Sequence, residues 1–594
     1  MRPAEVRNSE KIVNRAICAV KNFLNPFDVP DKQRLYCLSS GASVDSNVEH
    51  CVLTAETLGK EAKEKFVKDR LEKKDHFFEP VKRMNLKTMS SAHKTGRVKS
   101  TKNKIIEFKQ QSTVMINLLV RSQEGSAVDI EDLMTYPLTP VPFSIGTADG
   151  FMTKNDKSKG FDYLTKDIDS VQLPPFDTTL TIEDGNALFY YMHDLPGNFK
   201  EIVRKIFDLM GKNCNVVFST DTYLPNSIKA MERRRRGCGE KLIVQGELTK
   251  RPADWKAFLT NDQNKKQLIQ LILDIWSSAD FARNLATRNI IVIAEGHAYQ
   301  LQSLDGQTTD RMEIMSLHST QEETDTRIIL YCKYAQDNGY EYVRVRSPDS
   351  DVFFVLLLYV HEMTITVFFD TGTGNRRRLI NISELAEDFT TEYATALAAL
   401  HVFTHCDTTS AFKGIGKVKP IKLLQTNPKY QPILAQLGAC WDPSPSLVCG
   451  LEEFTCVLYG RKKFTSVDKL RYALIKEKCG SEDGFVKLRK NVDLSTLPPC
   501  SRALLQHIRR ANYQMCINRN AHVPVLDVPS PTEGHGWQMV DGNLEPLWFD
   551  GDLVPPVVVD NADDNQGNSD SEEDTADEDL SRYDVEDSDS ADEF

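Results

Sequence analysis

The region from Leu173 to Ala411 alternates short apolar runs with longer helical patterns, and this alternation most constrains the fold. The predicted strands are Thr178–Ile182, Asn215–Thr220, Asn289–Ala294, Tyr342–Arg346 and Thr364–Phe369. The predicted helices between them are Phe199–Lys212, Lys265–Thr287 and Thr324–Asn338. Strands that alternate with helices of this length predict an α/β fold with a mostly parallel, helix-flanked sheet.

Composition divides the rest of the chain, which at 594 residues is too long for one core. We expect a mixed, partly helical extension over residues 1–145 that ends in the proline-rich connector Tyr136–Pro142. The α/β domain covers residues 173–411, and a mostly helical region follows over 412–530. Residues 531–559 are expected to form an irregular strap, and residues 560–594 a disordered acidic tail.

Charge is distributed unevenly along the chain. Residues 560–594 hold 16 Asp and Glu against one Arg, so the remaining residues carry a net charge of +3 within the total of −12. No apolar run is long enough to span a bilayer, which excludes a membrane protein. The thirteen cysteines show no zinc-type spacing, and the chain opens without a secretory leader pattern. These features favour reduced thiols and an intracellular, nuclear rather than cytoplasmic, protein.

Five short acidic motifs lie in the α/β region, most of them after an apolar run or at the start of a helical pattern. They are Ile182–Ala187, Phe218–Asp221, Gln321–Asp325, Ser347–Asp351 and His405–Thr409. The carboxyl ends of parallel strands meet at one edge of a sheet, so we expect these carboxylates to converge there. The simpler interpretation of any one of them is helix capping or a turn, but five in series indicate a shared site.

The candidate metal ligands and catalytic residues are Asp184, Asp221, Glu323, Asp325, Asp349, Asp351 and Asp407. Divalent ions such as Mg²⁺ or Mn²⁺ prefer oxygen ligands, and two ions about 4 Å apart can hydrolyse a phosphodiester. Without metal, so many carboxylates would repel one another and raise their pKa values. The set therefore predicts a two-ion Mg²⁺ or Mn²⁺ centre. We place the Asp349 and Asp351 pair in a turn before the apolar run Val352–Tyr359.

Basic residues follow two of the motifs. Arg233, Arg234, Arg235 and Arg236 follow Asp221, where contact with a phosphate-rich ligand competes with a nuclear-import signal or a plain surface helix. Gly414, Gly416, Lys417, Lys419 and Lys422 follow Asp407. Their glycines allow close approach of a phosphate to the backbone, and their lysines supply charge. Both sets predict DNA or RNA as the partner, although a Gly-x-Gly followed by lysines is more often a turn.

A basic stretch and two histidines each have two possible interpretations. From Lys82 to Lys109 the chain carries nine Lys and Arg and one acid, which indicates either a nucleic-acid patch or a solvated loop. His318 and His405 flank two of the motifs. Each orients a ligand or, as the commoner case, is a buried, hydrogen-bonded histidine.

The order of the motifs resembles the PIN-like nuclease fold of the flap endonuclease family over roughly Leu173–Leu424. In that family a first metal Asp ends the first strand, as Asp184 does, and a second follows a Val-Val-Phe strand before an Arg-rich helix, as Asp221 does. A Glu-x-Glu pair and an Asp-x-Asp pair follow, matched by Glu323/Asp325 and Asp349/Asp351. The last Asp, matched by Asp407, precedes a helix–hairpin–helix-type element with a Gly-Ile-Gly hairpin.

The resemblance implies a PIN-like three-layer core, a two-metal mechanism of phosphodiester hydrolysis, and a hairpin at Gly414–Gly416 that holds a duplex backbone through a monovalent cation. It also implies catalytic basic residues between Gly237 and Arg288, for which Lys241, Lys250 and Arg251 are the candidates. The chain also resembles a set of animal proteins without established activity, for which a transposon origin is one interpretation.

Two alternatives to a nuclease remain. The first is a catalytically inactive PIN-like module that binds nucleic acid or supports assembly, which the long N-terminal extension and the acidic tail favour. The second is a transposon-encoded or host-adapted factor that works with a partner nuclease.

Overall fold

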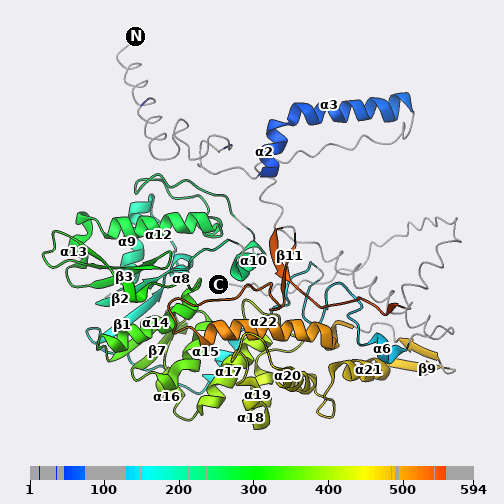
Figure 1. Ribbon diagram of the computed structural model, residues 1–594. Helices are drawn as coiled ribbons and strands as arrows, with labels where there is room; N and C mark the ends of the chain where they lie inside the picture. Colours follow the sequence, from blue (N-terminus) through cyan, green and yellow to red (C-terminus); the bar gives the residue numbers. More distant parts are fainter. Residues whose placement is uncertain are drawn as a thin grey trace.

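A mixed sheet of eight strands forms the core of the α/β part of the computed structural model, on the left in Figure 1. The structure describes Val13, Leu35 and residues 46–73, 129–147, 149–211, 213–225, 227–235, 237, 239–482, 485–488, 494–540 and 542–556. The basic stretch Lys82–Lys109 and the acidic tail from Asp560 lie outside the described residues. No described helix is both long and apolar enough to cross a bilayer.

The strand order is β5-β4-β3-β2-β1-β6-β7-β8. The strands are β1 (Thr179–Asp184), β2 (Asn215–Ser219), β3 (Asn289–Ala294), β4 (His297–Gln302), β5 (Asp310–Glu313), β6 (Tyr342–Arg346), β7 (Thr366–Thr371) and β8 (Arg378–Asn381). The five central strands β3, β2, β1, β6 and β7 are parallel, and the three edge pairings are antiparallel. The predicted α/β class with a mostly parallel sheet is confirmed, whereas the PIN-like detail stays a prediction.

Helices cover both faces of the sheet because its central strands bury both sets of side chains. In β2, Val216 and Phe218 face one hydrophobic core, and Val217 between them faces another. The first core includes α8 (Gly185–Tyr190), α9 (Phe199–Leu209), α11 (Trp255–Leu259), α12 (Asp262–Trp276) and α13 (Ala282–Leu285). The second includes α7 (Ser158–Leu164), α14 (Thr324–Asp337), α15 (Ser350–Tyr359), α16 (Ile382–Leu385) and α17 (Thr391–Thr404).

The second core continues into the C-terminal helices, so residues of the predicted helical region pack directly on the α/β part. These helices are α18 (Val418–Thr426), α19 (Gln431–Leu434), α20 (Pro445–Leu458), α21 (Val467–Lys478) and α22 (Ser501–Arg519). α22 runs beside α17 across the middle of the molecule (Figure 1). The predicted domain boundaries stay a prediction.

The remaining helices lie mostly outside these layers. They are α2 (Ser46–Leu53), α3 (Ala55–Phe66), α6 (Ile130–Leu133) and α10 (Ile228–Arg235), with a π-helix at Val67–Glu72. Short 3-10 turns are Ala279–Phe281, Met315–Leu317, Val360–Glu362, Gly374–Arg376, Pro428–Tyr430 and Leu494–Thr496. The proline-rich connector 136–142 contains neither helix nor strand, as its prolines predict.

The structure adds one detail to the sequence interpretation and corrects two. The apolar run Val352–Tyr359, to which the sequence assigned no element, belongs to helix α15, and all of its residues are buried, so it shows no helical periodicity. The predicted helix Lys265–Thr287 is divided, because α12 ends at Trp276 and a 3-10 turn precedes α13. The strap at 531–559 contains a hairpin of β11 (Trp537–Val540) and β12 (Asn543–Pro546). A second pair of the same length, β9 (Cys479–Glu482) and β10 (Phe485–Leu488), follows α21.

Candidate metal centre

All seven predicted acids lie at element ends near the carboxyl edge of the parallel strands. Asp184 ends β1, Asp221 follows β2, Glu323 and Asp325 open α14, Asp349 and Asp351 open α15, and Asp407 follows α17. The sheet runs from β1 to β2 and β3 on one side, and β6 and β7 lie on the other side of β1. Ligand sites of open α/β sheets lie where the strand order reverses in this way. All seven side chains are partly exposed.

Three of these carboxylates surround one ammonium group. Oxygens of Asp349, Asp351 and Asp407 lie within 4.8 Å of one another. The Nζ of Lys157 lies 2.9 Å from Asp349 Oδ1, 3.2 Å from Asp351 Oδ2 and 2.8 Å from Asp407 Oδ1. Lys157 immediately precedes α7, in a segment that the predicted domains do not include. Three carboxylates that together hold one cation form a site with the charge and oxygen donors that a divalent metal needs.

A second lysine joins this triad to the start of α14. Lys229 on α10 donates to Glu323 Oε2 at 3.1 Å and to Asp407 Oδ2 at 2.9 Å, and only 11% of its side chain is exposed. Asp407 therefore lies between two ammonium groups. These two lysines supply basic groups to the centre. Lys241, Lys250 and Arg251 are exposed, and their role stays a prediction.

Hydrogen bonds hold the first two aspartates in place. Asp184 accepts from the backbone N–H of Ala187 at 3.0 Å and from Ser347 Oγ at 3.1 Å, so one carboxylate connects α8 to the end of β6. Asp221 accepts from the backbone N–H of Thr324 at 2.9 Å. Gly185 is needed beside Asp184, because a Cβ there would lie 2.9 Å from the carbonyl oxygen of Ser219.

Burial and mutual repulsion raise the pKa values of four of the acids, Asp184, Glu323, Asp325 and Asp349. Desolvation raises the pKa of Asp184 to about 7, and the charges of Asp221 and Asp349 add to this effect. Desolvation also raises the pKa of Glu323 to about 7, against the attraction of Lys229. The pKa of Asp325 is raised well above its ordinary value by desolvation and by Asp349. Such shifts are expected where carboxylates are crowded, and they link these acids electrostatically.

Two acids keep low pKa values despite the burial that opposes ionisation. At Asp351, desolvation is outweighed by Lys157 and by a hydrogen bond from His401, whose Nε2 lies 2.8 Å from Oδ1, so the pKa lies below its ordinary value. At Asp407, desolvation is outweighed by Lys229 and Lys157, which hold the pKa well below its ordinary value. The centre therefore contains ionised and protonatable carboxylates side by side.

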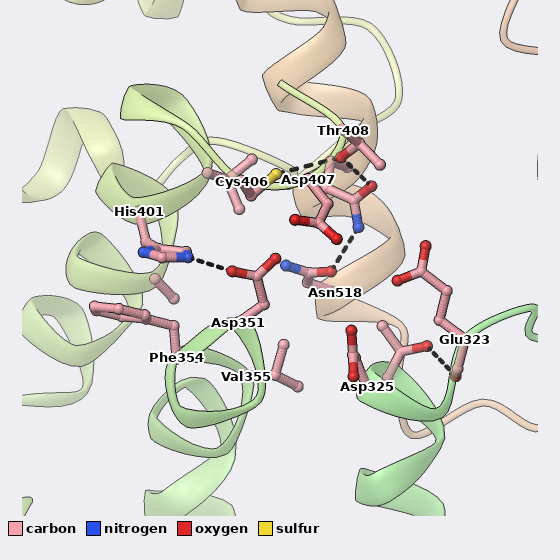
Figure 2. A pocket seen from close by; sticks show the side chains of 14 residues that line it. Glu323, Asp325, Asp351, Phe354, Val355, His401, Cys406, Asp407, Thr408 and Asn518 are labelled. Atoms are coloured by element: carbon pink, nitrogen blue, oxygen red, sulfur yellow. Dashed lines mark hydrogen bonds and ion pairs between the residues drawn. The ribbon is translucent and has the colours of Figure 1, made fainter. Parts of the chain in front are cut away.

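Figure 2 shows the carboxyl groups of Asp351, Asp407, Glu323 and Asp325 around one pocket. Its wall is completed by α15, α17 and α22, including the amide side chains of Gln514 and Asn518. The ring of His401 stacks on Phe354 at a centroid distance of 4.0 Å, which fixes its orientation toward Asp351.

The predicted arginines do not all reach this centre. Arg233 pairs with Glu322 at 2.8 Å and with Asp262 at 2.9 Å, so it holds α10 to the start of α14 and of α12. Arg234 donates to Asn543 in β12. The side chain of Arg235 and the whole of Arg236 lie outside the described residues.

The segment after Asp407 differs from its prediction at one residue. Gly414 has φ of 75° and is exposed with Gly416, and both Lys419 and Lys422 are exposed on α18. Lys417 is instead 2% exposed, and its Nζ donates to carbonyl oxygens of His401 and His405 at the end of α17. Burial lowers its pKa to about 7. Its side chain is turned inward, which contradicts the expected contact with a phosphate.

Several residues at the centre escape prediction from the sequence. Lys157 lies 25 residues before the first motif, and His401 lies four residues before the motif His405–Thr409, but no local pattern indicates a role for either. Arg327 is fully buried and donates to the carbonyl oxygen of Thr220 at 2.6 Å, which joins α14 to the residue before Asp221. The position of Arg327 in the predicted helix, four residues after Glu323, was the one sequence signal that could have indicated its place near the centre. His405 is 3% exposed and hydrogen-bonded to the carbonyl of Thr409, so it is the buried histidine of the two alternatives.

Comparisons with known proteins give little guidance. No protein-family model matches the chain, and no curated protein matches it. Among solved structures, a similarity is found to the crystal structure of the T5 D15 protein co-crystallized with metal ions. It covers 57% of this chain and 99% of that chain, with 13% identity and a TM-score of 0.25. A likeness this weak assigns neither a family nor a function to this chain.

Proposed function

We propose that this chain is a divalent-metal-dependent nuclease that hydrolyses phosphodiester bonds of DNA or RNA. The observation that carries the proposal is the gathering of acids from three separate segments, Glu323, Asp349 with Asp351, and Asp407, around Lys157 and Lys229. Carboxylates this close together need cations, and oxygen donors suit Mg²⁺ or Mn²⁺. Bound there, two ions would activate a water molecule and stabilise the leaving oxygen.

The contacts of each residue suggest which ion it would bind or which ligand it would position. Asp349, Asp351 and Asp407 hold the first ion, because their oxygens already lie within 4.8 Å of one another. Asp184, Asp221, Glu323 and Asp325 hold the second, directly or through water. His401 fixes Asp351 through its 2.8 Å hydrogen bond. Once a metal takes over the carboxylates, the ammonium groups of Lys157 and Lys229 are free to bind a phosphate.

Contact with the nucleic-acid backbone is assigned to the start of α18. Lys419 and Lys422 are exposed there, and Gly414 and Gly416 leave the backbone open to a close approach. A Cβ added at either glycine would meet no atom within 4 Å, so the space beside this turn is open.

A second candidate function is a module of the same fold that binds nucleic acid without cleaving it. The observation in its favour is that Lys157 and Lys229 already compensate the charges of the acids. A centre whose charge is partly compensated by its own lysines can hold its structure without metal, as expected of an active site that has lost catalysis.

The test compares the wild-type protein with the double variant Asp349→Ala/Asp351→Ala and with Asp274→Ala, an exposed carboxylate on α12, as the matched control. Branched and single-stranded DNA and RNA are incubated with Mg²⁺ or Mn²⁺. The nuclease proposal expects metal-dependent cleavage by wild type and control, and none by the double variant. Equal cleavage by all three proteins rejects the assignment of the centre. Salt-sensitive binding without cleavage by wild type favours the second candidate.

A further inference from the structure

We propose that His297, Glu313 and His318 form a second metal site, of the transition-metal type, that is separate from the carboxylate centre. A nitrogen of each histidine and a carboxylate oxygen of the glutamate all lie within 4.8 Å of one another. Among the described residues, this set and the Asp349, Asp351 and Asp407 triad are the two groups of at least three metal-binding side chains that lie so close together.

The backbone brings the three residues together at the antiparallel edge of the sheet. Tyr299 of β4 pairs directly with Glu313 of β5, and His297, two residues before Tyr299, lies on the same face of β4. The chain then turns through a 3-10 helix, whose Leu317 is buried in the core, and places His318 against the same hairpin.

Two backbone features hold this arrangement before any ligand binds. The N–H of Ser319, the residue after His318, donates to the carbonyl of Gly296, the residue before His297, at 3.0 Å. Gly296 has φ of 86°, and a Cβ there would lie 2.5 Å from the carbonyl oxygen of Ser319. The turn between β3 and β4 is therefore packed tightly against the segment that carries His318, so the relative position of the two imidazoles is fixed.

The donor atoms point at one another with nearly the spacing of a metal site. Glu313 Oε1 lies 3.1 Å from His297 Nδ1 and 3.0 Å from His318 Nε2, and the two rings meet edge to face at 4.6 Å. Ligands bound to zinc at about 2.0–2.1 Å in a tetrahedron lie about 3.3 Å apart. The nitrogen of His318 is buried and has no hydrogen bond of acceptable geometry, although it is close to the glutamate. An ion between the three atoms satisfies it.

The chemistry of the donors selects the ion. Two imidazoles and one carboxylate suit Zn²⁺, and also Co²⁺, Ni²⁺ or Cu²⁺, whereas Mg²⁺ prefers oxygen ligands alone. Three protein ligands leave a fourth tetrahedral position for water. The side chains are 53%, 41% and 21% exposed for His297, Glu313 and His318, so an ion can reach them from solvent. Zn²⁺ bound here would join the β4–β5 edge to the segment that leads to Glu322 and Glu323.

Zinc binding to the full-length protein tests this proposal. Isothermal titration with ZnCl₂ is carried out on wild type, His297→Ala, His318→Ala and His361→Ala, an exposed histidine outside the cluster, as the matched control. A fifth protein, Asp349→Asn/Asp351→Asn, reports any zinc that binds the carboxylate centre instead. Co²⁺ substitution gives a second readout, through the visible absorption of a tetrahedral site.

We expect one zinc ion to bind the wild-type protein. Its affinity should fall by about tenfold or more in His297→Ala and His318→Ala, and it should be unchanged in the other two variants. Its Co²⁺ absorption should disappear in the same two variants, and excess Mg²⁺ should not displace the zinc. Equal zinc binding by all five proteins, or a loss confined to the aspartate variant, overturns the proposal. Because Mg²⁺-dependent cleavage depends on the other centre, failure of the nuclease assay leaves this outcome unaffected.

Discussion

The ammonium nitrogen of Lys157 lies 2.8 Å from a carboxylate oxygen of Asp407, 250 positions further along the chain. The same nitrogen contacts Asp349 and Asp351, so one lysine holds three carboxylates that would otherwise repel one another. This contact connects the start of α7 to the starts of α15 and of the loop after α17. We therefore expect it to affect both the stability of the centre and its affinity for metal.

Replacing Lys157 by Met should destabilise the metal-free protein and tighten its binding of Mg²⁺. The variant leaves three carboxylates without their cation, at a cost of about 1–3 kcal/mol in the free energy of unfolding, and it removes a competitor of the metal. Chemical denaturation with and without Mg²⁺ measures both effects. Lys159→Met, whose side chain is 60% exposed, is the control and should change neither. A variant that is equally destabilised in saturating Mg²⁺ would show that the lysine acts only through packing.

Removal of divalent metal should lower the thermal stability of the wild-type protein. A ligand present at 100 times its Kd stabilises the folded state by about 2.7 kcal/mol, and a chelator reverses this. The double variant Asp349→Asn/Asp351→Asn should show a smaller difference in melting temperature with and without Mg²⁺, because it lacks two of the three ligands of the first ion. Thermal denaturation of both proteins in Mg²⁺ and in EDTA makes the comparison. A shift of equal size in both proteins would place the stabilising ion elsewhere.

Arg327 should be required to position the carboxylates at the start of α14. It is fully buried and donates to the carbonyl of Thr220, next to Asp221. In Arg327→Lys a single ammonium replaces the planar guanidinium, so we expect a loss of about 1–3 kcal/mol in unfolding free energy. We also expect weaker Mg²⁺ binding, measured by titration calorimetry. Lys333→Met, exposed on the same helix, should match wild type in both assays. Unchanged metal affinity in a folded Arg327→Lys protein would limit its role to stability.

His507 should make the protein sensitive to mild acid. It is fully buried on α22 beside Phe403, whose carbonyl accepts its Nε2–H at 2.8 Å, and burial lowers its pKa to about 3. The unfolded chain, with an ordinary histidine pKa near 6.5, binds more protons between these two values, so stability falls as pH drops below 6.5. From pH 7.5 to 5 this residue should remove about 2 kcal/mol.

The variant His507→Gln isolates this effect, because its amide can still donate to the carbonyl of Phe403 but does not titrate. It should lose about 2 kcal/mol less than wild type over the same pH range. Urea denaturation at the two pH values gives the four free energies. Identical pH dependence in the two proteins would show that other groups cause the acid sensitivity.

The sequence by itself determined the order of the central strands along the chain and the acids that follow them. Asn289–Ala294 and Tyr342–Arg346 are strands with the predicted bounds, because short runs of β-branched residues fit the interior of a parallel sheet. Each acidic motif lies at the end or start of an element, since turn and capping chemistry is local. Asp184 and Asp349 indeed cap the helices that follow them.

Tertiary structure alone decided how these pieces meet. Lys157 lies in a segment with no recognisable pattern, and its role depends on contacts across 250 positions. Lys417 follows an exposed glycine yet turns inward to the end of α17, which no local rule predicts. The edge strand β5 is exposed along its whole length, and α15 is buried on all sides, so neither shows the periodicity of its type. Hydrophobic periodicity in the sequence reveals only helices and strands that are half-buried. Long-range contacts decide the position of fully buried and fully exposed elements.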